Sequence, residues 1–256
     1  MTDFVDTTKL YIREISKSVA KDMIIKNHYT HKWSLCRVAY GIFYKSDKYN
    51  NFFNTTDDVL IGCAIFGQPV GRSAAESITP LIKINQVLEL TRLWVKDIPN
   101  DKNIESYSIS QCIKQIKIQF PDIKCIISYA DGEQSHKGTI YQACNFLYQG
   151  NSSVALMPNY SISLTKNPYN WMHSRTVSSK YGSHNVEHLK RTIGKTFYRK
   201  KESNKHRYIL FISNKGENRK FIKSLKHPIL PYPKNNKHID EIQEFLVENN
   251  SDNSFF

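Results

Sequence analysis

The chain has 256 residues, of which 40% are apolar, and it carries 36 Lys and Arg against 23 Asp and Glu. This length and apolar content suffice for one sizeable α/β domain with an appendage or for two small domains, and they exclude wholesale disorder. No apolar run approaches the roughly 18 to 20 residues of a membrane helix, and the N-terminus lacks a secretory pattern, so we expect a cytoplasmic protein with no membrane partner.

The predicted elements begin with a helix, because apolar residues recur every three or four positions over residues 9–27. Two strands follow over residues 35–44 and 58–67, joined by an Asn-rich loop. A third strand over residues 86–97 alternates apolar and polar side chains, as a half-buried strand does. Three neighbouring strands therefore open the predicted sheet.

Helices and strands then alternate. A helical period runs from Asn103 to Phe120 and ends at Pro121, and an apolar strand follows over residues 124–131. A short helix over residues 138–146 leads into one more strand. This order predicts an α/β fold in which helices flank a mixed sheet. The five cysteines show no paired spacing, which is typical of buried thiols in a reducing compartment.

The positive charge is concentrated in one segment. Residues 166–237 carry 18 Lys or Arg and three Glu, whereas residues 1–165 carry 18 and 15. A basic segment that also contains aromatic residues and His is typical of nucleic-acid contact, although a generic solvated surface would look similar. We predict a core over residues 1–165, a basic DNA-binding extension over 166–238, and an acidic, partly flexible tail over 239–256.

The expected DNA contacts are mainly phosphate contacts, which position a duplex without reading its sequence. They are assigned to Arg175, Lys180, Lys190, Arg191, Lys195, Arg199, Lys200, Lys201, Lys205 and Arg207.

His28 and Tyr29 end the first predicted helix. A His exchanges protons near neutral pH, and a Tyr donates hydrogen bonds or stacks on a base. The structural alternative is a His that satisfies a carbonyl at the helix C-terminus beside a packing Tyr. Together with His31, His28 could also begin a metal site, whose further ligands would come from Asp131, Glu89 or His136.

Two carboxylates stand out on predicted strands. Glu89 alternates with apolar neighbours, so it could act as a base in an apolar setting or serve structural pairing. Direct pairing with Arg92 is not expected, because residues three apart on a regular strand face opposite sides. Asp131 ends an apolar strand, where open α/β sheets gather ligands, although Asp before Gly is also ordinary turn chemistry.

Several segments, in order, resemble the phage Mom family, a branch of the GNAT acyltransferase superfamily. They are "NHYTHKW", "AIFGQP", "LELTRLWVKD", "NIES" and "ISYADGEQSHKGTIYQACNFLYQG", and the resemblance extends over residues 20–234. It implies a GNAT-like core and the transfer of a carbamoylmethyl group to adenine N6 in DNA. Such modification protects phage DNA from restriction, and it places the protein in the cytoplasm of a bacterial host.

The resemblance also implies site residues. The catalytic set is His28, Tyr29, Glu89, Asp131 and Tyr141. Tyr141 corresponds to the GNAT tyrosine that protonates a leaving group, although a core aromatic would have the same spacing. The set expected at the substrate or donor is Tyr40, Gly67, Arg92, Asn103, Ser106, Ser128 and Gly138. Ordinary helix capping is the alternative for Ser106.

Adenine N6 is paired and stacked in a duplex, so double-stranded DNA would have to present its base by flipping, at a cost of a few kcal/mol. Stacking on Tyr29, Trp33 or Tyr40 would offset that cost.

The segment expected to bind the donor departs from the GNAT pattern. "VKDIPNDKNIES" has no glycine where GNAT enzymes hold the pyrophosphate of coenzyme A on a Gly-rich loop. An acyl or glycyl-type donor is expected, and free N–H groups near Asn103 could still hold an anion. The resemblance also allows iron. Two alternative functions are an acetyl-CoA-dependent N-acetyltransferase acting on protein, RNA or a small molecule, and a non-catalytic nucleic-acid binder with a transferase fold.

Overall fold

The computed structural model describes residues 7–45, 49–50, 55–56, 58–69, 72–97, 103–132, 136–152, 159–202, 205–234 and 242–245. The chain forms two compact units. The first unit comprises Met1–Ala130, Lys137–Gly150 and His206–Pro233, and the second comprises Asp131–His136, Asn151–Lys205 and Lys234–Phe256. This division corrects the predicted boundaries, because residues 206–233 belong to the first unit rather than to a separate basic extension.

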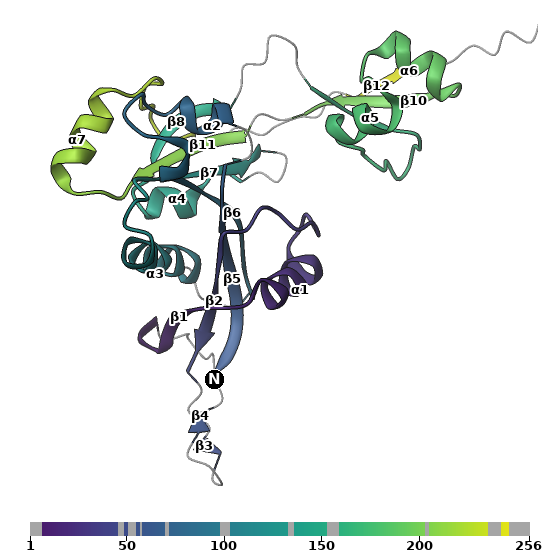
Figure 1. Ribbon diagram of the computed structural model, residues 1–256. Coiled ribbons are helices and arrows are strands. Elements are labelled where there is room, and N and C mark those ends of the chain that lie inside the picture. Colours follow the sequence, from purple (N-terminus) through teal and green to yellow (C-terminus); the bar gives the residue numbers. More distant parts are fainter. Residues whose placement is uncertain are drawn as a thin grey trace, which may run out of the picture. The chain divides into compact units, whose positions relative to one another are not determined.

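A seven-stranded sheet with the order β1-β2-β5-β6-β7-β11-β8 forms the first unit (Figure 1). Its strands are β1 (Leu10–Glu14), β2 (Val38–Tyr44), β5 (Val59–Gly67), β6 (Val87–Val95), β7 (Cys125–Asp131), β11 (Lys205–Phe211) and β8 (Leu147–Ser152). Strands β1, β2, β5 and β6 pair antiparallel, whereas β6 and β7 pair in parallel. The predicted mixed sheet is thus confirmed. Within the Asn-rich loop, β3 (Tyr49–Asn50) and β4 (Thr55–Thr56) pair with each other.

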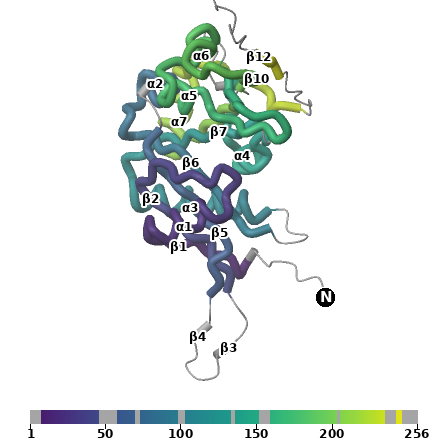
Figure 2. The backbone as a smooth tube through the Cα atoms, turned by 90° about the vertical axis from the view of Figure 1, so that its right-hand side faces the viewer, coloured from purple at the N-terminus to yellow at the C-terminus, as the bar shows by residue number. Residues whose placement is uncertain are grey.

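Helices cover both faces of this sheet. They are α1 (Lys17–Asn27), α2 (Arg72–Glu76), α3 (Ile104–Gln119), α4 (Thr139–Ala143) and α7 (Lys215–Lys223), with short 3-10 turns at Thr7–Lys9 and Ile84–Gln86. Phe66 of β5 packs with Ile109 of α3, whereas Ile65, its neighbour in the strand, packs with Ile24 of α1. Figure 1 shows α3 and α1 on opposite sides of β2 and β5, and α1 faces the viewer in Figure 2.

The predicted helix over residues 9–27 is wrong in its first third, because the chain forms β1 before α1. Strand β1 pairs with β2 at the edge of the sheet, and the helix begins only at Lys17. Ser16 is the N-cap, and its hydroxyl accepts the Val19 N–H at 3.3 Å. Backbone hydrogen bonds to β2 stabilise residues 10–14 as a strand despite their helical period. The Ser16 cap then fixes the start of the helix.

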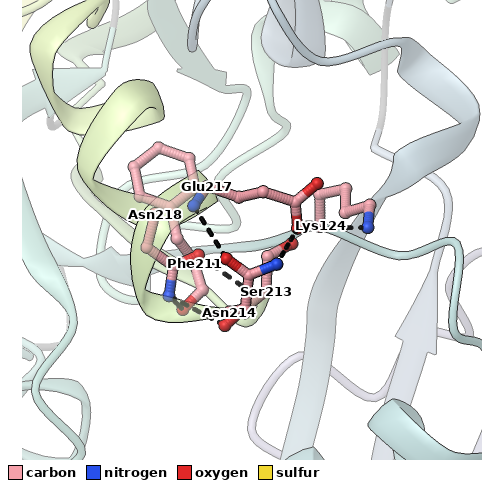
Figure 3. A network of polar contacts seen from close by, with 6 residues as sticks. All are labelled: Lys124, Phe211, Ser213, Asn214, Glu217 and Asn218. Carbon is pink, nitrogen blue, oxygen red and sulfur yellow. Dashed lines mark hydrogen bonds and ion pairs between the residues drawn. The ribbon is translucent and has the colours of Figure 1, made fainter.

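Side chains fasten the N-terminus of α7 to the loop after β11 (Figure 3). Asn214 caps the helix by accepting the Glu217 N–H at 2.9 Å. The Asn218 amide accepts the Ser213 N–H at 3.1 Å and donates to backbone carbonyls of the same loop. Lys124, which precedes β7, forms an ion pair with Glu217 at 3.5 Å. These contacts integrate residues 206–233 into the first unit.

The second unit has a three-stranded antiparallel sheet of order β12-β10-β9 and two helices. Its elements are β9 (Tyr160–Ser163), α5 (Ser174–Tyr181), α6 (Val186–Ile193), β10 (Phe197–Lys201) and β12 (Ile242–Phe245). Both helices pack on the sheet through a small core. This core consists of Ile162, Val177, Leu189 and Phe197.

Strand β12 comes from the segment predicted to be an acidic, partly flexible tail. Its Glu244 accepts a hydrogen bond from the Tyr198 hydroxyl at 3.1 Å and pairs with Lys166 at 3.5 Å. The tail therefore contributes an ordered strand, while residues 246–256 lie outside the described part. Among the described residues, no helix combines the length and apolar character needed to cross a bilayer.

Candidate active site

A β-bulge in β6 shapes the candidate site. Strand β6 pairs with β5 so that Leu90 lies opposite Phe66 and Arg92 lies opposite Ile65, which leaves Thr91 as an extra residue. A bulge of this kind interrupts the strict alternation of side chains.

The core contacts show the effect of the bulge on the strand. Leu90 and Leu93, three residues apart, both pack on the α3 side of the sheet. Glu89 and Arg92 therefore share the opposite face. This corrects the expectation that they point to opposite sides, which assumed a regular strand.

Arg92 is half-buried and is held by backbone carbonyls. Its Nη1 donates to the Thr91 carbonyl at 2.6 Å, and its Nε donates to the Lys32 carbonyl at 3.3 Å. Burial lowers the pKa of the guanidinium, and the nearby Tyr29 and Glu89 offset part of that shift. Arg92 shares its face of β6 with Glu89 and donates to the backbone at Lys32, three residues after Tyr29, so three predicted site residues lie in one region.

The segment after α1 carries His28 and Tyr29. His28 is the C-cap of α1, is only 7% exposed, and stacks on Tyr29 with ring centroids 4.4 Å apart. The Thr30 N–H lies 3.1 Å from His28 Nδ1, so this nitrogen accepts, and the neutral ring carries its proton on Nε2. His28 can then donate a hydrogen bond from Nε2. Tyr29 is 46% exposed and offers a ring to an incoming group.

The second His of the "HYTH" motif does not join His28 in a metal site. His31 has a positive φ of 47°, and its Nδ1 lies 2.9 Å from the Ile25 carbonyl at the end of α1. Within the described part of the chain, no three His, Cys, Asp or Glu side chains gather in a metal-binding arrangement. The described residues therefore offer no ligand set that fits a resident iron ion.

Tyr141 combines a core position with a polar contact. Its ring is 8% exposed and packs against Phe146 and Tyr208. Burial raises the pKa of its hydroxyl, a hydrogen bond with Ser128 lowers it, and Glu89 raises it. The fully buried Ser128 hydroxyl donates to the Leu90 carbonyl beside the bulge at 3.1 Å. Tyr141 is thus a neutral hydroxyl linked to the bulged strand.

Strands β6 and β7 separate at this point. Their parallel pairing ends at Leu90 and Ser128, although β6 continues to Val95 and β7 to Asp131. Backbone groups on the facing edges beyond Leu90 and Ser128 therefore do not pair with each other, and they can receive an extended ligand.

Asn103 and Ser106, which were predicted to contact the donor, lie at the start of α3. Asn103 is the N-cap, but its side chain makes no capping hydrogen bond. The Ser106 hydroxyl donates to the Asn103 carbonyl at 3.2 Å, so it serves the first turn of the helix. Residues 98–102, which precede Asn103, lie outside the described part. These residues fit an anion only through backbone N–H groups at the helix start, as expected without a Gly-rich loop.

The two predicted glycines act through close packing. A Cβ on Gly67 would lie 2.2 Å from the Leu35 carbonyl oxygen, so this glycine lets the segment after Tyr29 pass directly over β5. Gly138 is the N-cap of α4 with a φ of +73°, and a Cβ there would lie 2.4 Å from the Tyr208 ring. Both glycines allow the close packing that positions other site residues.

Two predicted stacking residues are placed differently from the expectation. Tyr40 is fully buried in the main core, and its hydroxyl donates to Gln119, so the predicted stacking role is wrong. Its place on β2 toward α3 explains the burial. Trp33 is half-buried and packs against the α1 cluster, which makes it a support for the Tyr29 segment.

Asp131 is the last residue of β7 and is half-buried. Its carbonyl accepts the His136 N–H at 3.1 Å, which closes the loop between them. The boundary between the two compact units falls directly before Asp131. Its predicted catalytic role rests on its position at the carboxyl end of a strand.

Sequence reasoning missed Tyr129. Burial raises the pKa of this tyrosine to about 12, with Arg207 lowering it and Glu89 raising it. Tyr129 is two residues from Ile127, and both pack in the cluster formed with α7. The period of two along β7 places Tyr129 on the same face as Ile127, and the pairing of Ile127 with Glu89 in the structure places Glu89 there too.

The predicted DNA-contacting cations fall into two environments. Arg207 is 7% exposed in β11 of the first unit, where Nη2 donates to the Ala74 carbonyl at 3.3 Å. It is therefore a buried residue rather than a surface contact, and its assignment to DNA was wrong. The other nine lie at or before Lys205, in the second unit, and all but Lys200 are exposed or half-buried.

The comparisons with known proteins agree with the sequence resemblance. The model of the Mom protein family matches residues 9–234. The chain belongs to the Mom protein family. It is 25% identical over 228 residues to the methylcarbamoylase Mom of Escherichia phage Mu, a match that covers 88% of this chain and 84% of that protein. The Mom match begins before α1 and ends after α7, so it includes most of the first unit and the part of the second unit that precedes β12.

Solved acetyltransferases are also similar to this Mom-family chain. An N-acetyltransferase from Staphylococcus aureus Mu50 matches with a TM-score of 0.40 and 13% identity, covering 80% of this chain and 99% of that one. A spermidine N-acetyltransferase from Vibrio cholerae matches with a TM-score of 0.42 and 9% identity, covering 80% and 96%.

Proposed function

We propose that this chain is a DNA-modifying transferase that adds a carbamoylmethyl group to N6 of adenine in double-stranded DNA. Membership in the Mom family and the similarity to a protein named methylcarbamoylase support the type of transfer. The observation that carries the proposal is the bulge in β6, which brings Glu89 and Arg92 to one face beside Tyr29.

Glu89 is the proposed base. In the transfer, adenine N6 forms a bond to the methylene carbon of the donor, the bond from that carbon to the leaving group breaks, and N6 loses a proton. Glu89 accepts this proton, since the neutral His28 already holds its own proton on Nε2. His28 instead donates a hydrogen bond that orients the base or the donor.

Tyr141 is the proposed acid. Its buried hydroxyl stays protonated because burial raises its pKa, so it can give a proton to the leaving group. The donor is an acyl or glycyl-type compound that lies along the separating edges of β6 and β7. The helix start at Asn103 would face an anionic part of that donor through its N–H groups.

Adenine N6 becomes reachable when the base leaves the duplex. The half-exposed Tyr29 ring, supported by His28, would stack on the extruded base and offset part of the unstacking cost of a few kcal/mol. Asp131 would position this base from the carboxyl end of β7.

The direct test is mass spectrometry of nucleosides from plasmid DNA in cells that express the protein. The expected result is a modified adenine nucleoside with the mass of the carbamoylmethyl derivative, and its absence in cells expressing Glu89→Gln. An unchanged adenine profile with folded parent protein would overturn the proposal. Acetylated protein or RNA in the same cells would support an acetyltransferase instead.

A further inference from the structure

Two cations of the second unit are engaged in its own packing. The Arg199 guanidinium lies 4.0 Å from the centre of the Tyr160 ring and 4.8 Å from that of Phe245, and its Nε donates to Gln243 at 2.9 Å. Lys200 is 9% exposed, and its ammonium lies 5.2 Å from the centre of the Trp171 ring. Their charges hold the small sheet together, so they are poorly placed for DNA.

Four exposed cations lie on or directly after the two helices of this unit, and none of them forms an ion pair with an acid of the described residues. Lys201 and Lys205 are also exposed, but they lie at the ends of β10 and β11. The nearby acids have other partners, since Glu187 of α6 pairs with Lys190 at 3.4 Å, and Glu202, directly after β10, pairs with His173 at 3.2 Å. The four uncompensated cations are Arg175, Lys180, Arg191 and Lys195.

Three of these cations, Arg175, Lys180 and Arg191, lie on the outer faces of the two helices, and Lys195 directly follows the Gly194 cap of α6. Val177 of α5 and Leu189 of α6 are fully buried against the sheet. The residues exposed on the other side are polar throughout. They are Arg175, Thr176, Ser179 and Lys180 on α5, and Glu187, His188, Arg191 and Thr192 on α6.

The connection between the helices is short and well defined. Helix α5 ends at Gly182 in the left-handed conformation with a φ of +81°, and α6 starts after the Asn185 cap, which accepts the Glu187 and His188 N–H groups. Two short helices joined by a turn of this length that contains Gly have the dimensions of a helix-turn-helix unit.

We propose that the outer face of α5 and α6 clamps the phosphate backbone of duplex DNA, with the four uncompensated cations making the charged contacts. This inference rests on the proposed function, which requires a duplex held while one base leaves the stack. The clamp neutralises phosphates and releases counterions, so it works on any sequence.

The composition of this face favours DNA over an acidic protein. Protein interfaces are centred on aromatic and apolar anchors. In the described part of the chain, none of the exposed large apolar residues lies on α5 or α6. The face instead combines cations with the hydroxyls of Thr176, Ser179 and Thr192, the side chains that contact phosphate oxygens.

The test compares two variants of the full chain that each lose four positive charges. The first changes Arg175, Lys180, Arg191 and Lys195 to Gln. The matched control changes four exposed cations of α7 in the first unit to Gln, namely Lys215, Arg219, Lys220 and Lys223. Binding to two duplexes of unrelated sequence is measured across a salt series, and circular dichroism checks the fold.

In the first variant, affinity should fall roughly tenfold or more for both duplexes, and the slope of log affinity against log salt should decrease by about 3.6. The control should bind like the parent. Equal weakening of both variants, or parent-like binding by the first variant, would overturn the clamp. Weakening on one duplex alone would also overturn it.

The outcomes separate this inference from the proposed function. If the first variant loses DNA but the parent leaves adenine unmodified, the clamp stands and the function fails. If the parent modifies adenine and the first variant does so with the same KM, the function stands and the clamp fails.

Discussion

Two arginines of the first unit and two of the second lie in opposite environments. In the first unit, Arg92 and Arg207 are half-buried or buried and donate to backbone carbonyls. In the second unit, Arg175 and Arg191 are exposed on helices and have no carboxylate partner among the described residues. The same side chain is therefore a fixed part of the candidate site in one unit and a solvated charge in the other.

This difference teaches that net charge alone does not locate a nucleic-acid surface. Arg207 lies in the basic stretch of the sequence, yet it is buried between β7 and β8. Burial removes its charge from the surface and places it near Tyr129. The candidate site of the first unit and the proposed DNA contacts of the second can therefore be tested by separate substitutions.

The largest expected effect is on chemistry in the first unit. Glu89→Gln keeps the shape of the side chain but removes the proposed base, so the rate of adenine modification should fall by about 10² to 10⁴. DNA affinity should stay the same. The rate is measured by nucleoside mass spectrometry over time with purified protein and donor-containing extract.

The matched control for Glu89→Gln is Glu76→Gln at the exposed end of α2, which should modify adenine at the parental rate. If Glu89→Gln retained the parental rate, Glu89 would not be the base, and the chemistry would not depend on the bulged strand in the proposed way.

Gly67→Ala should destabilise the part of the first unit that carries the candidate site. The new Cβ would lie 2.2 Å from the Leu35 carbonyl oxygen, so the segment that carries Tyr29 must shift. The free energy of unfolding should fall by about 2 kcal/mol, and modification should fall with it. Chemical denaturation measures the loss.

The control is Gly216→Ala in α7, where the nearest atom to the new Cβ is the Asn214 side-chain oxygen at 3.4 Å. Since Ala favours a helix, this change should raise stability by roughly 0.5 to 1 kcal/mol. Equal effects of the two substitutions would contradict the close approach at Gly67.

Tyr129 should make the first unit sensitive to alkali. Burial raises the pKa of Tyr129 to about 12, whereas an unfolded Tyr titrates near 10. Above pH 10 the unfolded chain binds fewer protons than the folded one, so stability is complete below pH 10 and is lost toward pH 12. The loss through Tyr129 is about 1.4 kcal/mol per pH unit in this range.

Denaturation at pH 8 and pH 11 tests this expectation. Tyr129→Phe should lose less stability than the parent between these values. A pH dependence identical to that of the parent would show that Tyr129 does not titrate in the buried environment described.

The smallest expected effects are those of replacing one arginine in each unit with methionine. Arg207 is buried, forms no ion pair within the described residues, and has an Nε without a hydrogen-bond partner. Arg207→Met should raise the free energy of unfolding by about 1 kcal/mol and leave DNA affinity unchanged. Thermal and chemical unfolding, with DNA binding in parallel, measure both quantities.

Arg191→Met should show the reverse pattern, with stability within about 0.5 kcal/mol of the parent and weaker, less salt-dependent DNA binding. If Arg207→Met weakened DNA binding as much as Arg191→Met, the contrast between the two units would not hold.

Much of the first unit could be predicted from local patterns. The apolar alternation in β6 and the helical period ended by Pro121 mark real elements, because these patterns record which face of each element is buried. The bulge at Thr91 could not be predicted, because it depends on how β6 pairs with β5. The early strand β1 was missed for the same reason, since its pairing partners in β2 lie 26 to 34 residues further along the chain, from Glu14 with Tyr40 to Leu10 with Tyr44.

The candidate site shows the same limit. Sequence motifs indicated His28, Tyr29, Glu89 and Arg92 as separate candidates, and the Mom resemblance indicated their family. The proximity of Tyr29, Glu89 and Arg92 results from one extra residue in a strand. Tyr40 and Tyr29 were both predicted to stack on the base. Tyr40 is instead a core residue, because its face of β2 packs toward α3.

Amino-acid composition and order were sufficient to establish the mixed α/β class, the Mom resemblance and a strongly basic C-terminal part, because these depend on local periodicity, motifs and charge. Which charges remain on the surface depended on long-range pairing. Strand β11 carries Arg207 into the seven-stranded sheet, while α5 and α6 keep Arg175 and Arg191 in solvent. A charge is buried or solvated by the elements packed around it, and those neighbours come from distant parts of the chain.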